Sequence, residues 1–312
     1  TAAVEAGDPK AVLAHFTQIG EFLENRGTKV DTHVHIIDFG YLALLLALMQ
    51  RRVSFSERIK LRLAILFLTG AVLLPVSVFL IHYVGLKYSP LQSIGWASIA
   101  ADFGGLLVIL AIAGELAGVW RHFRSTLPKP VSDNLRNGWS ESALLSGGTL
   151  LILAGFLHGA WYAVFYLERH ETGDQRLLSE IIDRASARRP VVENTTSGVD
   201  QSLTAYGGLQ AEKAINIAAH SHLIEFGIVA ILLAFAQELV LLKERWKRRW
   251  VGFLLAGSAI LPVFVLLEGR FGLPAGAVAD GGGFLIILAL SGMLVGVIRH
   301  GAVVDAATGY TE

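Results

Sequence analysis

Two short histidine phrases hold the residues of this chain that are best suited to carry chemistry. The first runs from His33 to Gly40 and the second from His220 to Gly227. Both read His-x-His, two apolar residues, an acid, Phe and Gly, and both open a long apolar segment. Imidazole and carboxylate groups are costly to place at the mouth of a membrane helix, so their presence there favours ligand binding or proton transfer. The duplication predicts a paired site.

The spacing inside each phrase limits what its side chains can do together. His33 and His35 point roughly 200° apart on a helix, so they do not readily hold one ion between them. Asp38 and Glu225 come three residues after His35 and His222, and each acid therefore shares a helix face with that histidine. A carboxylate in this position either joins the imidazole on a metal ion or accepts the hydrogen bond from its second ring nitrogen.

Further polar residues are expected at the depth of these phrases. Asp102 and Asp280 fall at the outer ends of the third and seventh predicted spanning helices, and His82 ends the second helix on the same side. His158 lies in the middle of an apolar segment, where it could ligate a cofactor, transfer a proton or make a structural hydrogen bond. The candidate metal ligands are His33, His35, Asp38, His82, Asp102, His220, His222, Glu225 and Asp280. The alternative, that these groups only cap helix ends or contact lipid headgroups, stays open.

The composition places these residues in a membrane protein. The chain has 312 residues, of which 53% are hydrophobic and 17% are charged, too apolar a balance for a soluble domain. The absence of cysteine excludes disulfides, thiolate metal sites, iron–sulfur clusters and covalently attached c-type haem. The net charge is zero, which gives no indication of a nucleic-acid partner. No nucleotide-binding loop or hydrolase triad is recognisable, so the sequence assigns no catalytic residue.

Apolar segments long enough to cross a hydrocarbon core of about 30 Å predict an all-α polytopic fold with seven transmembrane helices. They cover residues 32–50, 61–85, 93–121, 141–168, 214–242, 249–268 and 279–299. Residues 1–30 hold an amphipathic segment that is too short and too polar to span, and they lack the pattern of a cleaved signal. Residues 169–213 are expected to form an extracytoplasmic cap, and residues 301–312 a C-terminal tail.

Basic residues follow the first, third and fifth predicted helices, whereas the alternate short loops hold only Lys87 and Arg270. The positive-inside rule therefore predicts an outer N-terminus and a cytoplasmic C-terminus, in a bacterial inner membrane. Membrane lipid and other subunits of a redox complex are the expected partners.

The similarity between the two halves extends well beyond the histidine phrases. Gln50 matches Gln237, and the Pro75 segment Leu-Pro-Val matches the Pro262 segment, at one constant offset. After a short gap, Asp102 matches Asp280. We therefore predict two three-helix repeats, residues 31–122 and 214–300, joined by a linker transmembrane helix within residues 123–168. Three crossings plus one restore the starting side, so the two repeats are parallel.

The glycine pairs after the matched aspartates expose backbone on a helix face. Gly104-Gly105 and Gly282-Gly283 permit the close approach of another helix or of a flat cofactor. Glu115, deep in the third helix, has no acidic counterpart in the second repeat, which makes it a candidate for a proton path or for a structural ion pair.

The histidine phrase resembles the signature of the NnrS family. It is also similar to the haem-ligating helix of distant relatives of haem–copper oxidase and nitric oxide reductase catalytic subunits. This resemblance, which covers only the phrase in each copy, implies haem b ligation by His33 or His35 and by His220 or His222. It does not imply reduction of oxygen or nitric oxide, because no further helix carries the paired histidines of a haem–copper centre.

Three functions remain open at the level of the sequence. The first is a b-type haem protein that passes electrons near the outer membrane face, with His158 as a further candidate ligand. The second is a non-haem site in which the same histidines and acids hold iron, copper or zinc. The third is a cofactor-free scaffold subunit whose polar rim binds partners.

Overall fold

The structure, a computed structural model, describes residues 34–83, 96–126, 138–167 and 194–308, together with short pieces between residues 169 and 180. All regular elements in these residues are helical. The amphipathic segment predicted within residues 1–30 lies outside the described residues.

Seven helices in the described part of the chain are long and apolar enough to cross a membrane, as predicted, and they indicate a membrane-embedded protein. The first occupies residues 34–49 and continues into a 3₁₀ turn, Gln50–Arg52. The others are α3 (Glu57–Tyr83), α4 (Trp96–Thr126), α5 (Gly138–Tyr162), α7 (Asn194–Phe235), α8 (Glu244–Phe271) and α9 (Leu273–Thr308). A π-helical turn, Ala163–Leu167, follows α5.

Helix α7 differs most from its predicted bounds, because it begins at Asn194 instead of near residue 214. The polar and glycine-containing residues before 214 led the sequence prediction to assign them to an extracytoplasmic cap. In the structure they are helical and continue without a break into the apolar part of α7. Helical hydrogen bonding satisfies the backbone whether or not a segment is apolar, so hydropathy locates only the part of the helix that can enter a membrane.

The described chain belongs to two compact units. One unit holds the described residues within 34–38, 72–104 and 160–216, and the other holds the described residues within 39–71, 105–159 and 217–308. His220, His222 and Glu115, whose contacts are described below, lie in the second unit.

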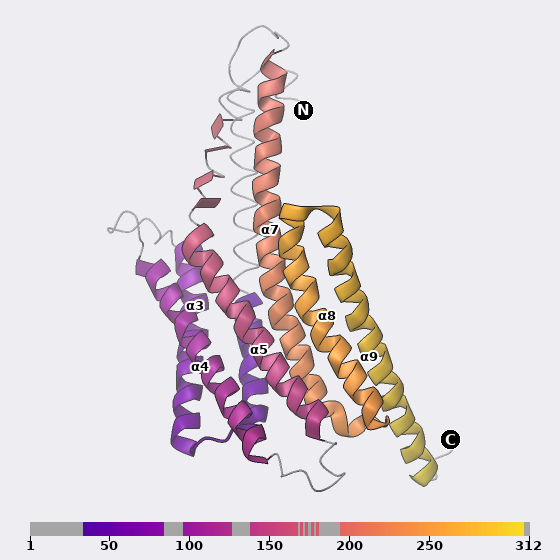
Figure 1. Ribbon diagram of the computed structural model, residues 1–312. Helices are drawn as coiled ribbons and strands as arrows, with labels where there is room; N and C mark the ends of the chain where they lie inside the picture. Colours follow the sequence, from indigo (N-terminus) through magenta and orange to yellow (C-terminus); the bar gives the residue numbers. More distant parts are fainter. Residues whose placement is uncertain are drawn as a thin grey trace. The chain divides into compact units, whose positions relative to one another are not determined.

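Helices α8 and α9 form an antiparallel pair in the second unit (Figure 1). Gly272 alone joins them and has φ 64° and ψ −148°, a conformation that only glycine adopts readily. Its N–H donates to the carbonyl oxygen of Glu268 at 2.8 Å and so closes the end of α8.

Matched positions of the two halves make matching contacts. The Ser54 N–H donates to the Gly118 carbonyl oxygen at 3.1 Å, and the Leu241 N–H donates to that of Gly296 at 3.0 Å. Each bond holds the turn that follows a short 3₁₀ helix against the last helix of its half. Pro75 and Pro262 likewise lie inside α3 and α8.

The matched glycines allow close approach between helices. A Cβ on Gly104 would lie 2.7 Å from the backbone nitrogen of Leu74, and one on Gly282 would lie 2.8 Å from that of Leu261. Of the two uses left open for the glycine pairs, the structure shows helix packing at both of these positions. Gly148 on α5 and Gly227 on α7 make a third close crossing, because a Cβ on either would lie within 2.7 Å of the other's carbonyl oxygen.

Candidate functional site

His220, in the second phrase, is held by helix α5. Its Nδ1 lies 2.8 Å from the carbonyl oxygen of Gly155. A carbonyl oxygen only accepts hydrogen bonds, so Nδ1 carries the hydrogen, and the neutral ring has its ligating electron pair on Nε2. Gly159 makes room for the ring, since a Cβ there would lie 2.6 Å from His220 Nδ1.

Phe156 on α5 connects this imidazole to the first phrase. Its ring contacts His220 edge to face, with centroids 6.2 Å apart. It also stacks on Phe39, the aromatic residue of the first phrase, with centroids 5.8 Å apart and an interplanar angle of 8°. Residues of both phrases therefore meet the same ring, that of Phe156 on α5.

His222 faces different helices from His220, as their spacing predicts. It lines a cavity of about 530 Å³ formed with α8 and α9, where the apolar lining includes Leu261, Val265 and Phe284. Two carboxylates, Glu268 and Asp280, line the same cavity. His222 and Asp280, both among the predicted candidate ligands, therefore line one cavity.

The His222 ring is positioned by its own helix. It stacks on Phe226, with centroids 5.5 Å apart and an interplanar angle of 14°. Its Nδ1 lies 3.8 Å from a carboxylate oxygen of Glu225, which confirms that these two residues share a helix face. Nδ1 is buried and makes no hydrogen bond. His222 Nδ1 therefore lies beside the Glu225 carboxylate without a hydrogen bond.

The first phrase is described only in part. His33 lies outside the described residues, and so does the side chain of His82, whose backbone is helical. His35 and Asp38 are half-buried, and Asp102 is exposed on α4. His158 is half-buried on α5.

In the described part of the chain, no three His, Asp or Glu side chains approach closely enough to hold a metal ion. The described residues therefore supply no group of three such side chains as a metal site, and the prediction that the histidines and acids of both phrases lie at one depth stays a prediction. His33 and His82 are left out of that comparison.

Sequence reasoning missed a polar triad in the first unit, in which Tyr162 and His170 are buried and Glu212 is exposed. The hydroxyl of Tyr162 lies 3.1 Å from Nδ1 of His170, whose Nε2 lies 3.4 Å from a carboxylate oxygen of Glu212. His170 is 4% exposed, and Tyr162 and Tyr166 stack beside it. The three residues come from separate segments with no common spacing, so only the fold brings them together.

Comparison with known proteins gives no relative for this chain: no protein-family model, no curated protein and no solved structure matches it.

Proposed function

We propose that this protein is an integral-membrane b-type haem protein. In this proposal it passes electrons near the outer membrane face as a subunit of a larger redox complex. The observation that carries the proposal is the orientation of His220. Its hydrogen bond through Nδ1 to a backbone carbonyl is the arrangement that fixes ligating histidines in metal proteins.

The number of ligands favours haem over an ion held by side chains alone. A zinc ion takes three or four protein ligands, whereas haem iron needs only its axial ligands from the protein. The described residues offer single well-placed imidazoles but no group of three ligating side chains. This geometry supports haem more than the non-haem alternative.

The chain's own residues would hold and tune the group. His220 would be the primary ligand, and His222, with the carboxylate of Glu225 3.8 Å from its ring, is the second candidate on the same phrase. The apolar cavity wall beside His222 would exclude water from a macrocycle ligated by His222, whereas His220 lies against α5 and does not line this cavity. When bound, a b-type haem supplies one-electron chemistry whose potential depends on its ligands and surroundings.

The proposal includes a gene duplication, and the matched contacts support it. Equivalent 3₁₀ turns, equivalent hydrogen bonds to Gly118 and Gly296, and equivalent glycine crossings recur in the two halves. The sequence offset is constant within each matched segment and changes once, by nine residues, between the Pro75–Pro262 match and the Asp102–Asp280 match.

An inner-membrane location, with the turn between α7 and α8 on the cytoplasmic side, is also part of the proposal. Trp246 lies under Arg249 at 4.8 Å, and Trp139 lies under Arg248 at 5.4 Å. Tryptophan and arginine together at helix ends are typical of a membrane–water interface, and basic residues mark the cytoplasmic side.

The test is an absorption spectrum of the full chain, purified from cells supplied with a haem precursor. We expect a Soret band that shifts on reduction, and a pyridine haemochrome spectrum of the b type. The His220→Ala variant should lose most of the bound haem, and His222→Ala should change the spectrum or the haem content less strongly. His300→Ala, at the far end of α9, is the control and should keep full haem content.

A colourless protein would overturn the proposal. In that case, elemental analysis would separate the two remaining functions. Stoichiometric iron, copper or zinc would indicate a non-haem site, and the absence of metal would leave the scaffold function.

A further inference from the structure

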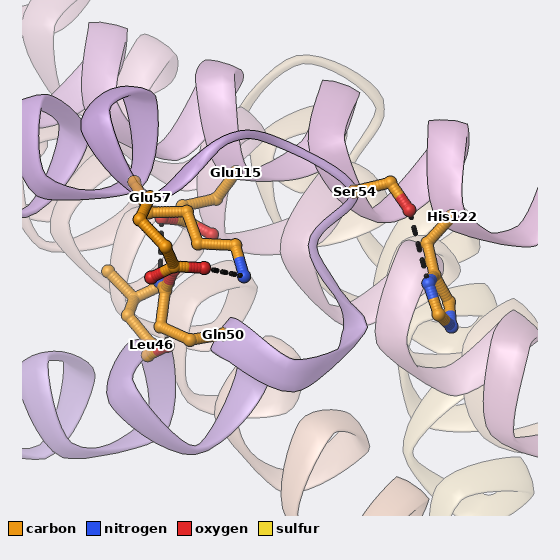
Figure 2. A network of polar contacts seen from close by, with 7 residues as sticks. Leu46, Gln50, Ser54, Glu57, Glu115 and His122 are labelled. Carbon is orange, nitrogen blue, oxygen red and sulfur yellow. Dashed lines mark hydrogen bonds and ion pairs between the residues drawn. The ribbon is translucent and has the colours of Figure 1, made fainter.

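A carboxyl group is buried in the second unit at a distance from the histidine phrases. Glu115 on α4 is 2% exposed. The side-chain amide of Gln50 donates to Glu115 Oε1 at 2.9 Å and to the Leu46 carbonyl oxygen at 3.1 Å (Figure 2). Both hydrogens of that amide are therefore in use.

Two oxygens of this pair are left without hydrogen bonds. Glu115 Oε2 and Gln50 Oε1 are both buried and have no hydrogen-bond partner. A buried acceptor without a donor costs about 1–3 kcal/mol, and a buried carboxylate without compensation costs more. Glu115 Oε2 and Gln50 Oε1 therefore lack a hydrogen-bond donor.

The second half of the chain provides an internal comparison. Gln237 occupies the place of Gln50 and likewise donates to the carbonyl oxygen four residues earlier, that of Leu233, at 3.1 Å. Where Glu115 would stand, that half has Met293, whose sulfur lies 4.0 Å from the Gln237 amide nitrogen. The same packing is achieved with a thioether, so the fold does not require the acid.

The charged groups around Glu115 do not neutralise it by a direct bond. Lys60 on α3 acts on Glu115 electrostatically, but its ion pair at 3.0 Å is with Glu57. Arg52, which follows Gln50 on the first helix, pairs with Glu141 on α5 at 2.8 Å.

One further polar pair lies on the same side of α4. Two turns along the helix, His122 lies 3.3 Å from the hydroxyl of Ser54 (Figure 2). In the second half, Leu241 stands at the position of Ser54. The half that holds the acid therefore also holds the polar pair beside it.

We propose that Glu115 and Gln50 form a buried proton-binding site, in which the Glu115 carboxylate takes up one proton from water and later returns it. The amide and the carboxyl already face each other through Nε2 and Oε1, so a hydrogen on Oε2 places a donor beside the amide oxygen. One proton removes the buried charge and supplies the missing donor. The proposal does not depend on haem.

A proton fits this site better than a metal ion. Calcium and magnesium take at least about six oxygen ligands. Here the side chains offer two carboxyl oxygens and one amide oxygen, and among the described residues Glu115 belongs to no group of three His, Asp or Glu side chains that could hold a metal ion.

The test is infrared difference spectroscopy of the purified full chain in lipid nanodiscs, recorded across a pH series in H₂O and D₂O. We expect the carbonyl band of a protonated carboxylic acid, which shifts in D₂O and is lost in Glu115→Gln. In Gln50→Leu the band should stay but move, because the carbonyl loses its hydrogen-bond donor. Glu238→Gln, which removes an exposed acid, is the matched control and should keep the band unchanged.

Glu115→Met copies the second half and serves as the folding control. It should purify as a folded protein and lack the band. The proposal is overturned if no protonated-acid band depends on Glu115, or if a Glu115 carboxylate band responds to sodium and not to potassium. It is also overturned if neither Glu115 variant folds, since the acid would then be structural.

Discussion

At the scale of single residues, the two histidines of the second phrase have different surroundings. His220 is oriented by a backbone carbonyl and packed against α5, whereas His222 lines a cavity between other helices. Their separation on one helix was predictable from the roughly 100° turn per residue. The contacts of His220 with the Gly155 carbonyl and with Gly159 were not predictable from the sequence, because the contacts of an imidazole depend on which helix lies beside it.

The role of this orientation is testable through Gly159. Gly159→Ala would place a Cβ 2.6 Å from the His220 ring and force the imidazole to move. If His220 is the haem ligand, haem affinity should fall by about 10–100-fold, the usual effect of disturbing a ligand's support. Haem titration of the apoprotein measures the change.

Gly252→Ala is the control, since a Cβ there meets nothing within 4 Å. It should leave the affinity unchanged. Unaltered haem binding in Gly159→Ala would remove His220 from the proposed ligand set.

At the scale of elements, glycines set how closely helices pack. The last glycine of the second phrase, Gly227, lies in the tight crossing of α5 and α7, whereas its counterpart in the first phrase, Gly40, is exposed with no neighbour for a Cβ. The sequence shows both glycines in identical phrases. Only the packing reveals that one is a helix contact.

This difference predicts opposite effects of the same substitution. Gly227→Ala would place a Cβ 2.5 Å from an Ile152 side-chain atom and 2.6 Å from the Gly148 carbonyl oxygen. It should lower the free energy of unfolding by about 1–3 kcal/mol, the range for overpacking. Gly40→Ala should be neutral or stabilise by up to about 1 kcal/mol, because alanine favours the helix.

The two variants would be compared by thermal unfolding in one detergent. Equal stabilities would contradict the crossing of α5 and α7.

At the scale of the whole molecule, the seven apolar helices are the feature that the sequence predicts best, and the described part of the chain has seven helices of this kind. Hydropathy over a long window measures the one property that a membrane helix needs, which is apolar length. The proposed orientation rests on basic residues at the ends of the helices.

Single-cysteine labelling tests this orientation directly, because the chain has no cysteine of its own. Ser56→Cys and Lys243→Cys, in the turns before α3 and α8, should react with a membrane-impermeant maleimide only from the cytoplasmic side. Leu273 lies just beyond the other end of α8 and is 85% exposed. A cysteine at this position, Leu273→Cys, should react only from outside. Labelling of all three positions from one side would show that α8 does not cross the membrane.

The sequence by itself determined the helical class, the seven apolar segments, the matched positions of the two halves and the histidine phrases. These follow from composition and local spacing. The tertiary structure decided which histidine faces which helix, placed Gln50 against Glu115, and assembled Tyr162, His170 and Glu212. Helices that are apolar on nearly every side carry no periodic signal that selects a packing face, so such contacts between distant segments are fixed only when the helices pack.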